Sequence, residues 1–88
     1  MMQGKSALEA VLEERQRQQD KWGEQNHSPY YWLGILMEEV GEFSHDLIEN
    51  LPKTMEQELV QVVAVALAML ECCYRNNWRN EDFREGVR

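Results

Sequence analysis

The sequence predicts an all-α fold: a single-domain helical bundle that is completed by oligomerisation. Three observations lead to this prediction. The chain has only 88 residues, its apolar residues recur at helical spacing, and both prolines stand where helices would begin or end. A chain of this length buries only roughly 60 to 65% of the surface that its unfolded form exposes. Because two cysteines and no metal-finger spacing offer little covalent support, we expect copies of the chain to cover the rest.

The first predicted helix covers residues 6–20. Leu8, Val11 and Leu12 recur there at helical spacing among charged residues and glutamines, which is typical of an amphipathic helix. The turn-rich sequence that follows predicts a loop over 21–28.

The second predicted helix covers residues 29–50. Ser28 followed by Pro29 predicts its start, because serine caps helix N-termini and proline suits the first helical position. The sequence ENLP predicts that this helix ends before Pro52.

The third predicted helix covers residues 54–77, and TMEQ at its start, from Thr54 to Gln57, matches a capping box. Its valine content is also typical of strands, but an unbroken run of about twenty residues is too long for an ordinary strand. From residue 59 to 70 this helix is apolar on nearly every side. Because two other helices can hardly cover it completely, the third helix also indicates partner subunits.

The remaining tail, residues 78–88, is polar except for Trp78 and Phe83, which we expect to pin it to a subunit surface. Cys72 and Cys73 are adjacent in a helical stretch and cannot readily bond to each other. We therefore expect two reduced thiols with no role in function, as in a cytoplasmic protein.

Charge and hydropathy narrow the class of protein. The formal net charge of −7 argues against nucleic-acid binding, which needs a concentrated basic face. The N-terminal sequence lacks the apolar segment of a signal peptide, and the longest apolar run, Val60 to Leu70, is short for a membrane span and contains Gln61. We expect a soluble, cytoplasmic protein without a membrane partner.

The second predicted helix carries an unusual density of carboxylates. At helical spacing they form one strip beside the apolar stripe: Glu38, Glu39, Glu42, Asp46 and Glu49. A solvated helix face is the simplest interpretation. However, residues 32–49 contain no lysine or arginine to relieve the repulsion, and Ile35 lies within the strip.

The third helix supplies a second polar pair, Glu58 and Gln61, three residues apart at the start of the apolar run. Each also has a purely structural explanation. Glu58 could be a first-turn glutamate that the helix dipole favours, and Gln61 could be a polar residue that lines a helix interface. Together with Glu39 and Glu42 they form two pairs on helices expected to pack together. Such pairs bring hard oxygen ligands to one point, as Mg²⁺ requires, with Mn²⁺ as an alternative.

These motifs resemble those of the MazG-like all-α nucleoside triphosphate pyrophosphohydrolases, whose signature is EExxE, a variable spacer and ExxD. The matching segments are EEVGE and ELVQVVAVALA, and ERQRQQDKWGEQ…H resembles the N-terminal segment of a short, single-domain branch. The resemblance covers residues 9 to about 74. It implies that Glu39, Glu42 and Glu58 bind Mg²⁺ and that Glu38 binds a second ion or orients the attacking water.

The fourth ligand position of the family motif is Gln61 here, not aspartate. Glutamine can offer a neutral oxygen to Mg²⁺, but it removes one negative charge and cannot act as a base. Weaker metal binding, a different number of ions and lost turnover are the alternatives that this departure leaves open.

Four residues around the first loop are candidates for binding a nucleotide. Trp22, His27 and Trp32 could stack on a base while Lys21 meets a phosphate. Each also has a structural explanation, since tryptophans often anchor cores, lysines are usually solvated and His27 could complete a turn.

The sequence therefore predicts a Mg²⁺-dependent hydrolase that converts a nucleoside triphosphate, in particular a deoxynucleotide, to its monophosphate and pyrophosphate. The resemblance implies a role in housecleaning of the nucleotide pool. The short chain and the apolar third helix predict a homodimer or homotetramer. The alternative is a non-catalytic helical oligomer that binds a nucleotide or a protein partner. Gln61 favours the alternative, and the uncompensated carboxylates favour the enzyme.

Overall fold

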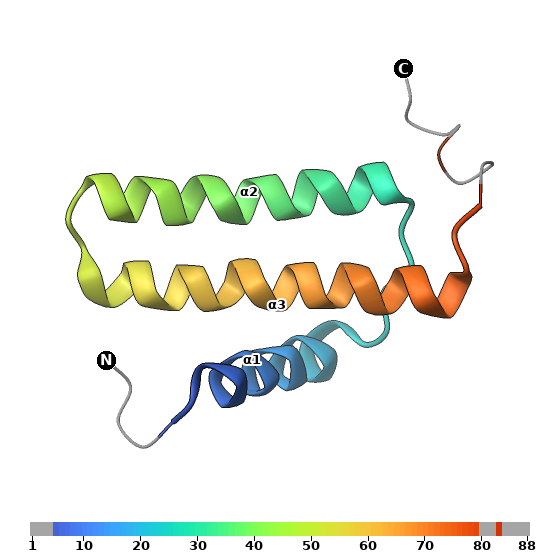
Figure 1. Cartoon of the computed structure of the whole chain (residues 1–88), viewed down its shortest axis with the longest axis horizontal. Helices are drawn as coiled ribbons and strands as arrows, with labels where there is room; N and C mark the ends of the chain where they lie inside the picture. Colours follow the sequence, from blue (N-terminus) through green and yellow to red (C-terminus); the bar gives the residue numbers. More distant parts are fainter. Residues whose placement is uncertain (1–4, 80–82, 84–88) are drawn as a thin grey trace.

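The computed structural model of the chain describes residues 5–79 and 83. The described chain is all-α, as predicted, with three long helices: α1 (Ala7–Trp22), α2 (Pro29–Ile48) and α3 (Pro52–Asn76). Figure 1 shows α2 and α3 as an antiparallel pair, with α1 crossing α3 obliquely on the side away from α2. α3 packs against both other helices, whereas the described backbones of α1 and α2 do not pack against each other. The central helix is therefore the apolar one.

The first helix is capped at both ends by local sequence signals. The Glu9 amide donates to Ser6 Oγ at 3.1 Å, and the Ser6 amide donates to Glu9 Oε1 at 2.8 Å, which completes a capping box that the sequence analysis missed. Gly23, with φ 73°, ends the helix in a conformation that favours glycine. α1 therefore runs two residues beyond its predicted end.

The start of α2 is confirmed. Ser28 Oγ accepts a hydrogen bond from the Tyr31 amide at 3.3 Å, and Pro29 occupies the first turn. The helix ends at Ile48, slightly before the predicted end. Asn50 then adopts a positive φ of 64°, which turns the chain directly into α3.

The predicted capping box of the third helix is wrong. α3 begins at Pro52, and its N-cap, Leu51, makes no side-chain capping bond. Because the fixed φ of proline is already helical, the helix starts before the TMEQ sequence. Thr54 therefore lies inside the first turn, where its hydroxyl donates to the Leu51 carbonyl at 3.4 Å.

The hydrophobic core lies between α2 and the C-terminal half of α3. Its centre is Trp32, which is 2% exposed and packs with Val65, Ala68 and Cys72. The core is extended by partly buried neighbours, namely Ile35, Leu36, Met69 and Trp78. Both cysteines are free thiols, as predicted, and Cys72 is a buried packing residue.

The loop between α1 and α2 is fixed to the end of α3 by side chains. Asn26 Oδ1 accepts hydrogen bonds from Arg75 at 3.0 and 3.1 Å and from Asn76 Nδ2 at 2.8 Å. Arg75 also donates to the Gln25 carbonyl at 3.0 Å. Because α1 and α2 lack direct backbone contact, this loop and α3 set their relative position.

Most of the predicted tail lies outside the described residues. Its two aromatic residues are described, and their rings meet edge to face with centroids 6.1 Å apart. Trp78 packs against the core of the same chain, and the Phe83 ring lies 6.3 Å from that of Tyr30. The two aromatic residues therefore hold the described part of the tail against the same chain.

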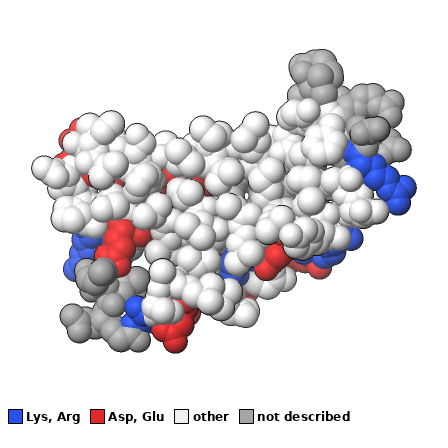
Figure 2. Space-filling view, in the orientation of Figure 1, with Lys and Arg blue, Asp and Glu red and all other residues white. Residues whose placement is uncertain are grey.

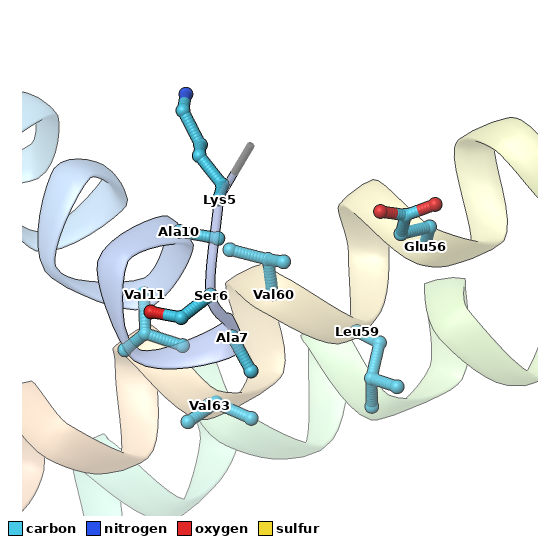
Figure 3. A pocket seen from close by; sticks show the side chains of 9 residues that line it. All are labelled: Lys5, Ser6, Ala7, Ala10, Val11, Glu56, Leu59, Val60 and Val63. Atoms are coloured by element: carbon cyan, nitrogen blue, oxygen red, sulfur yellow. The ribbon is translucent and has the colours of Figure 1, made fainter. Parts of the chain in front are cut away.

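The apolar face predicted for α1 is only partly buried, which corrects the simple amphipathic picture. Leu8 and Leu12 are 65% and 51% exposed, whereas Ala10 and Val11 are buried. Since α1 packs on α3 alone, only a narrow strip of its surface is covered. An apolar groove of about 300 Å³ separates the start of α1 from α3, with Val11, Leu59, Val60 and Val63 among its lining residues (Figure 3).

Uncovered surface is also present along the two long helices. Figure 2 shows a face over α2 and α3 with few charged side chains. α3 is long and apolar enough to cross a membrane by length and composition, and only 22% of the qualifying window is buried within the chain. The shortness of Val60–Leu70 therefore does not exclude a span, although the core helix of a soluble protein has the same properties.

Candidate metal and ligand site

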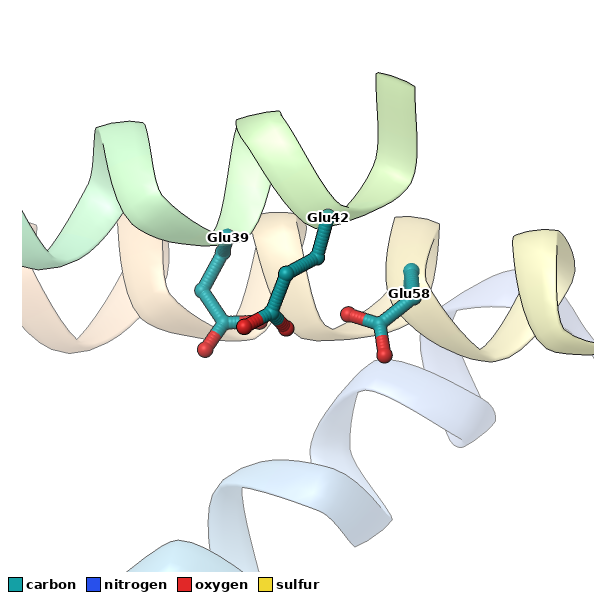
Figure 4. A group of neighbouring side chains, drawn as sticks. All are labelled: Glu39, Glu42 and Glu58. Atoms are coloured by element: carbon teal, nitrogen blue, oxygen red, sulfur yellow. The ribbon is translucent and has the colours of Figure 1, made fainter. Parts of the chain in front are cut away.

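Three predicted metal ligands come together on the side of the α2–α3 pair that faces α1. One carboxylate oxygen each from Glu39, Glu42 and Glu58 lies within 4.8 Å of the other two. Figure 4 shows the carboxylates of Glu39 and Glu42, from α2, close together and that of Glu58, from α3, turned toward them. The arrangement is that of a group of hard oxygen ligands around one point.

Helical geometry and the turn between the helices account for this convergence. Glu39 and Glu42 are three residues apart on α2 and so lie on one face. The short turn after Ile48 returns the chain antiparallel to α2, which places the first turns of α3 beside the second half of α2. Glu58, in the second turn of α3, thereby reaches the same face.

Electrostatic strain accompanies the cluster. Partial burial raises the pKa of Glu58 to about 7, with help from the negative charges of Glu42, Glu39 and Asp46. Burial, together with the charge of Glu42, also raises the pKa of Glu39. Both groups are thus held in surroundings that disfavour their ionised forms.

The described chain provides no internal cation to relieve this strain. Glu39, Glu42 and Glu58 form no ion pair with any described lysine or arginine, since Arg15 pairs with Glu71 and Arg17 with Glu14. In addition, Glu39 Oε1 and Glu58 Oε1 are buried without a hydrogen-bond partner among the described residues. Buried, unpaired carboxylate oxygens are costly. A bound divalent cation would satisfy them, so the residues present fit such an ion.

A cavity adjoins the carboxylates between the three helices. This central cavity has a volume of about 260 Å³ and is lined by Gln18, Trp22, Gln25, Trp32, Ile35, Glu38, Glu39, Gln61, Val65 and Ala68. Two of its lining residues, Glu38 and Gln61, are the remaining members of the predicted metal and catalytic set. Its lining therefore combines acidic, amide and apolar side chains.

Glu38 and Gln61 lie near the cluster of Glu39, Glu42 and Glu58 but are not part of it. Glu38 is exposed and also lines a groove with Glu42 and Glu58. Gln61 follows Glu58 by nearly one helical turn and lines a second cavity on the side of α1 that carries Arg17. An ion or ligand held by the carboxylates would therefore be within the neighbourhood of both.

The structure places only two of the four predicted nucleotide-binding residues, Trp22 and Trp32, in the lining of the central cavity. Trp22 is 52% exposed at the rim of the central cavity, and Lys21 Nζ lies 4.8 Å from its ring centroid. Trp32 lines the cavity as a buried core residue, not as a free stacking platform. His27 does not line this cavity, and its ring packs against those of Tyr31 and Trp32 with centroids 4.4 and 5.1 Å away.

Sequence reasoning missed several residues near the site. Gln18 and Gln25 line the central cavity, Asp46 lines the groove beside Glu42, and the negative charge of Glu14 contributes to the raised pKa of Glu39. Asp46 was visible as part of the acidic strip. Gln18 and Glu14 lie on α1, and only the way in which α1 crosses α3 brings them to the site.

Comparisons of the chain with protein-family models, with curated proteins and with solved structures find no match. The functional interpretation therefore depends on the geometry of the site and on the motifs of the sequence.

Proposed function

We propose that the chain is a Mg²⁺-dependent nucleoside triphosphate pyrophosphohydrolase that releases a nucleoside monophosphate and pyrophosphate. The observation that carries this proposal is the convergence of Glu39, Glu42 and Glu58 from two helices, with unpartnered oxygens and no described cation, beside a cavity. Mn²⁺ is the alternative ion. Membership of the MazG-like family, in its short single-domain branch, and a role in housecleaning of deoxynucleotides belong to the same proposal.

The carboxylates would act as oxygen ligands, with Gln61 offering a neutral oxygen beside them. When bound, Mg²⁺ supplies positive charge that offsets the charge of the triphosphate and of the departing pyrophosphate. Glu39, Glu42 and Glu58 fix its position, because all three lie on packed helices and not on loops. This positioning accounts for carboxylates that would otherwise only destabilise the fold.

Glu38 is the proposed catalytic residue. Glu38 lines both the central cavity and the groove beside Glu58, so its carboxylate could accept a proton from a water molecule next to the ligand cluster. That water would attack the α-phosphorus. A new P–O bond forms, the bond from the α-phosphorus to the bridging oxygen breaks, and pyrophosphate leaves with the electron pair.

The direct test is a product assay with purified protein, Mg²⁺ and a panel of triphosphates. We expect pyrophosphate from wild type, its loss in Glu58→Gln, and little change in Glu49→Gln, whose carboxylate lies at the exposed end of α2. Release of orthophosphate would instead indicate attack at the γ-phosphorus. Absence of both products with every triphosphate would contradict catalysis.

Association of copies, as a homodimer or homotetramer, is the second part of the proposal. Leu8 and Leu12 of α1 are exposed, Val63 is exposed in the apolar groove between α1 and α3, and much of α3 is uncovered. A partner subunit would bury this surface in a cytoplasmic protein, and polar contacts such as Arg15 with Glu71 suit a helix inside a soluble bundle. In light scattering at micromolar concentration, we expect at least a dimer, and Leu12→Glu should weaken it. A monomer of 10.4 kDa would contradict this part.

The alternative is a non-catalytic helical oligomer that binds a nucleotide or a protein partner. Gln61 favours it, because glutamine replaces the acidic ligand of the family motif. Metal binding and tight nucleotide binding without any turnover would support this alternative.

A further inference from the structure

The central cavity contains a buried glutamine that neither the metal cluster nor the proposed chemistry uses. Gln18 lies on α1, is 6% exposed and lines the cavity opposite the apolar side chains of α2 and α3. Buried amides need hydrogen-bond partners, so their orientation carries information about the site. We propose that Gln18 recognises the hydrogen-bonding edge of a nucleobase in this cavity; this inference rests on the proposed function and names its base-reading residue.

The orientation of the Gln18 amide is fixed by charged neighbours on both sides. Its Oε1 accepts a hydrogen bond from Arg15 Nη1 at 3.3 Å, and its Nε2 donates to Glu14 Oε2 at 3.3 Å. Because arginine can only donate and a carboxylate only accept, the amide cannot be flipped without losing both bonds. A ligand therefore meets an amide with a defined donor side and a defined acceptor side.

The two neighbours of Gln18 are themselves anchored. Arg15 donates to Glu71 of α3 at 2.6 and 3.2 Å, and Glu14 accepts from Arg17 at 2.6 and 2.9 Å. The Arg15–Glu71 pair connects α1 to α3. Gln18 is thus preorganised by a chain of charge-assisted bonds, which is what a specificity residue requires.

The amide retains unused hydrogen-bonding capacity. A glutamine side chain offers two N–H groups and two oxygen lone pairs, and Arg15 and Glu14 occupy one of each. One N–H group and one oxygen lone pair remain available to a ligand. This is the pattern that glutamine uses to bind the adjacent donor and acceptor of a base such as adenine in pairs of hydrogen bonds.

The rest of the cavity suits a flat heterocycle connected to a phosphate chain. Its lining includes the apolar side chains of Ile35, Val65 and Ala68. It also includes the half-exposed Trp22, whose ring could stack on a base. The volume of about 260 Å³ is close to the lower limit of roughly 300 Å³ for small-molecule sites. Glu39 is in the same wall, so a base beside Gln18 would leave the phosphates near the carboxylates.

A second buried polar group lines the same cavity. Trp32 is 2% exposed, and its Nε1 has no hydrogen-bond partner among the described residues. An unpaired buried donor is rare and costs free energy unless a ligand or a water molecule satisfies it. Two observations, the preorganised amide and the unpaired indole, therefore point to a polar ligand in one cavity.

The test measures base recognition without metal and without turnover. Quenching of tryptophan fluorescence is titrated with the monophosphates of the four deoxynucleosides and with deoxyribose 5-phosphate as the base-free probe. The variants are Gln18→Leu, which removes both hydrogen-bonding groups, and Gln18→Glu, which keeps the shape but removes the donor. Gln16→Leu is the matched control, because Gln16 is exposed on the same helix and contacts only Asp20 at 2.9 Å among its described hydrogen bonds.

We expect wild type and Gln16→Leu to prefer one base and to bind its monophosphate at least about tenfold more tightly than deoxyribose 5-phosphate. Both Gln18 variants should lose that preference by a similar factor. Equal base preference in wild type and in a folded Gln18 variant would overturn the inference, as would binding of the base-free probe as tight as that of every nucleotide. Should Gln18→Leu unfold, circular dichroism reveals it and Gln18→Glu decides.

The outcome is separable from that of the proposed function. Loss of base preference in the Gln18 variants supports the inference even when no triphosphate is hydrolysed. Conversely, pyrophosphate release with the same base preference in wild type and Gln18→Glu supports the enzyme and overturns only the role of Gln18.

Discussion

The two ends of the α2–α3 pair are built in opposite ways. At one end, Trp32 is buried against Val65, Ala68 and Cys72, and the Asn26 hydrogen bonds fix the preceding loop. At the other end, the carboxylates of Glu39 and Glu58 lie close together and partly buried, and one oxygen of each lacks a hydrogen-bond partner among the described residues. The first end is tightly packed and held by hydrogen bonds, although the indole nitrogen of Trp32 lacks a described partner, whereas the second end concentrates negative charge. Marginally stable proteins can hold such an unfavourable cluster only where packing elsewhere compensates for it, which is typical of functional sites.

The largest expected effect comes from the packed end. Trp32→Ala should lower the free energy of unfolding by about 3 to 5 kcal/mol, because it removes the largest side chain of the core and leaves a cavity. Trp22→Ala, at a half-exposed position, should cost much less. Urea unfolding of both variants measures the difference. Equal losses in the free energy of unfolding would mean that the core is not centred on Trp32.

The pH dependence of stability should distinguish the carboxylate end. The pKa of Glu58 is raised from 4.5 to about 7 in the folded chain, so the folded state holds this proton more tightly than the unfolded state does. The resulting stabilisation is complete below about pH 4.5 and is lost as pH rises through about 7. Because the Glu58 side chain is only partly buried, screening by solvent reduces the size of this effect.

Thermal melts of metal-free protein between pH 4.5 and 8 test this prediction. The stability of wild type relative to Glu58→Gln should fall as pH rises, whereas wild type and Glu49→Gln should follow each other. A constant difference between wild type and Glu58→Gln would show that Glu58 ionises normally.

A bound divalent cation should offset the repulsion among the carboxylates and so stabilise the folded chain. Mg²⁺ or Mn²⁺ at a hundredfold excess over its dissociation constant should stabilise the folded chain by about 2.7 kcal/mol through mass action. Glu39→Gln should slightly stabilise the metal-free protein, because it removes one repelling charge, and should abolish the response to metal. Differential scanning fluorimetry measures both. An equal metal response in wild type and Glu39→Gln would identify the strip as a solvated face.

The smallest expected effect concerns Gln61, between the two ends. Gln61→Asp adds a charged oxygen and should tighten metal binding about tenfold, which corresponds to about 1.4 kcal/mol. Turnover is preserved or raised if Gln61 is a weakened ligand, and falls if the site is built around a neutral amide. Calorimetry and the pyrophosphate assay report the two quantities. If Gln61→Asp and Gln61→Ala both leave them unchanged, Gln61 is a packing residue.

Local spacing made several features predictable. The helical period places Glu39 and Glu42 on one face whatever the rest of the chain does, and Ser28 with Pro29 determines the start of α2 through its own hydrogen bond and ring geometry. The start of α3 was not predicted correctly, because Pro52 and the TMEQ sequence both favour a helix start there. The helix begins at Pro52, two residues before TMEQ. Sequence patterns identify helices more reliably than their ends.

What the sequence alone determined was the all-α class, the helical segments and the carboxylate pairs, since each depends on interactions within a few residues. Only the tertiary structure decided which strip of α1 is buried. Leu8 and Leu12 have the apolar character of core residues, yet the crossing of α1 over α3 buries Ala10, Val11 and Gln18 instead. The central cavity follows from that crossing, because its lining comes from all three helices. The crossing also anchors Arg15, which holds the Gln18 amide, to Glu71, 56 positions away in the sequence.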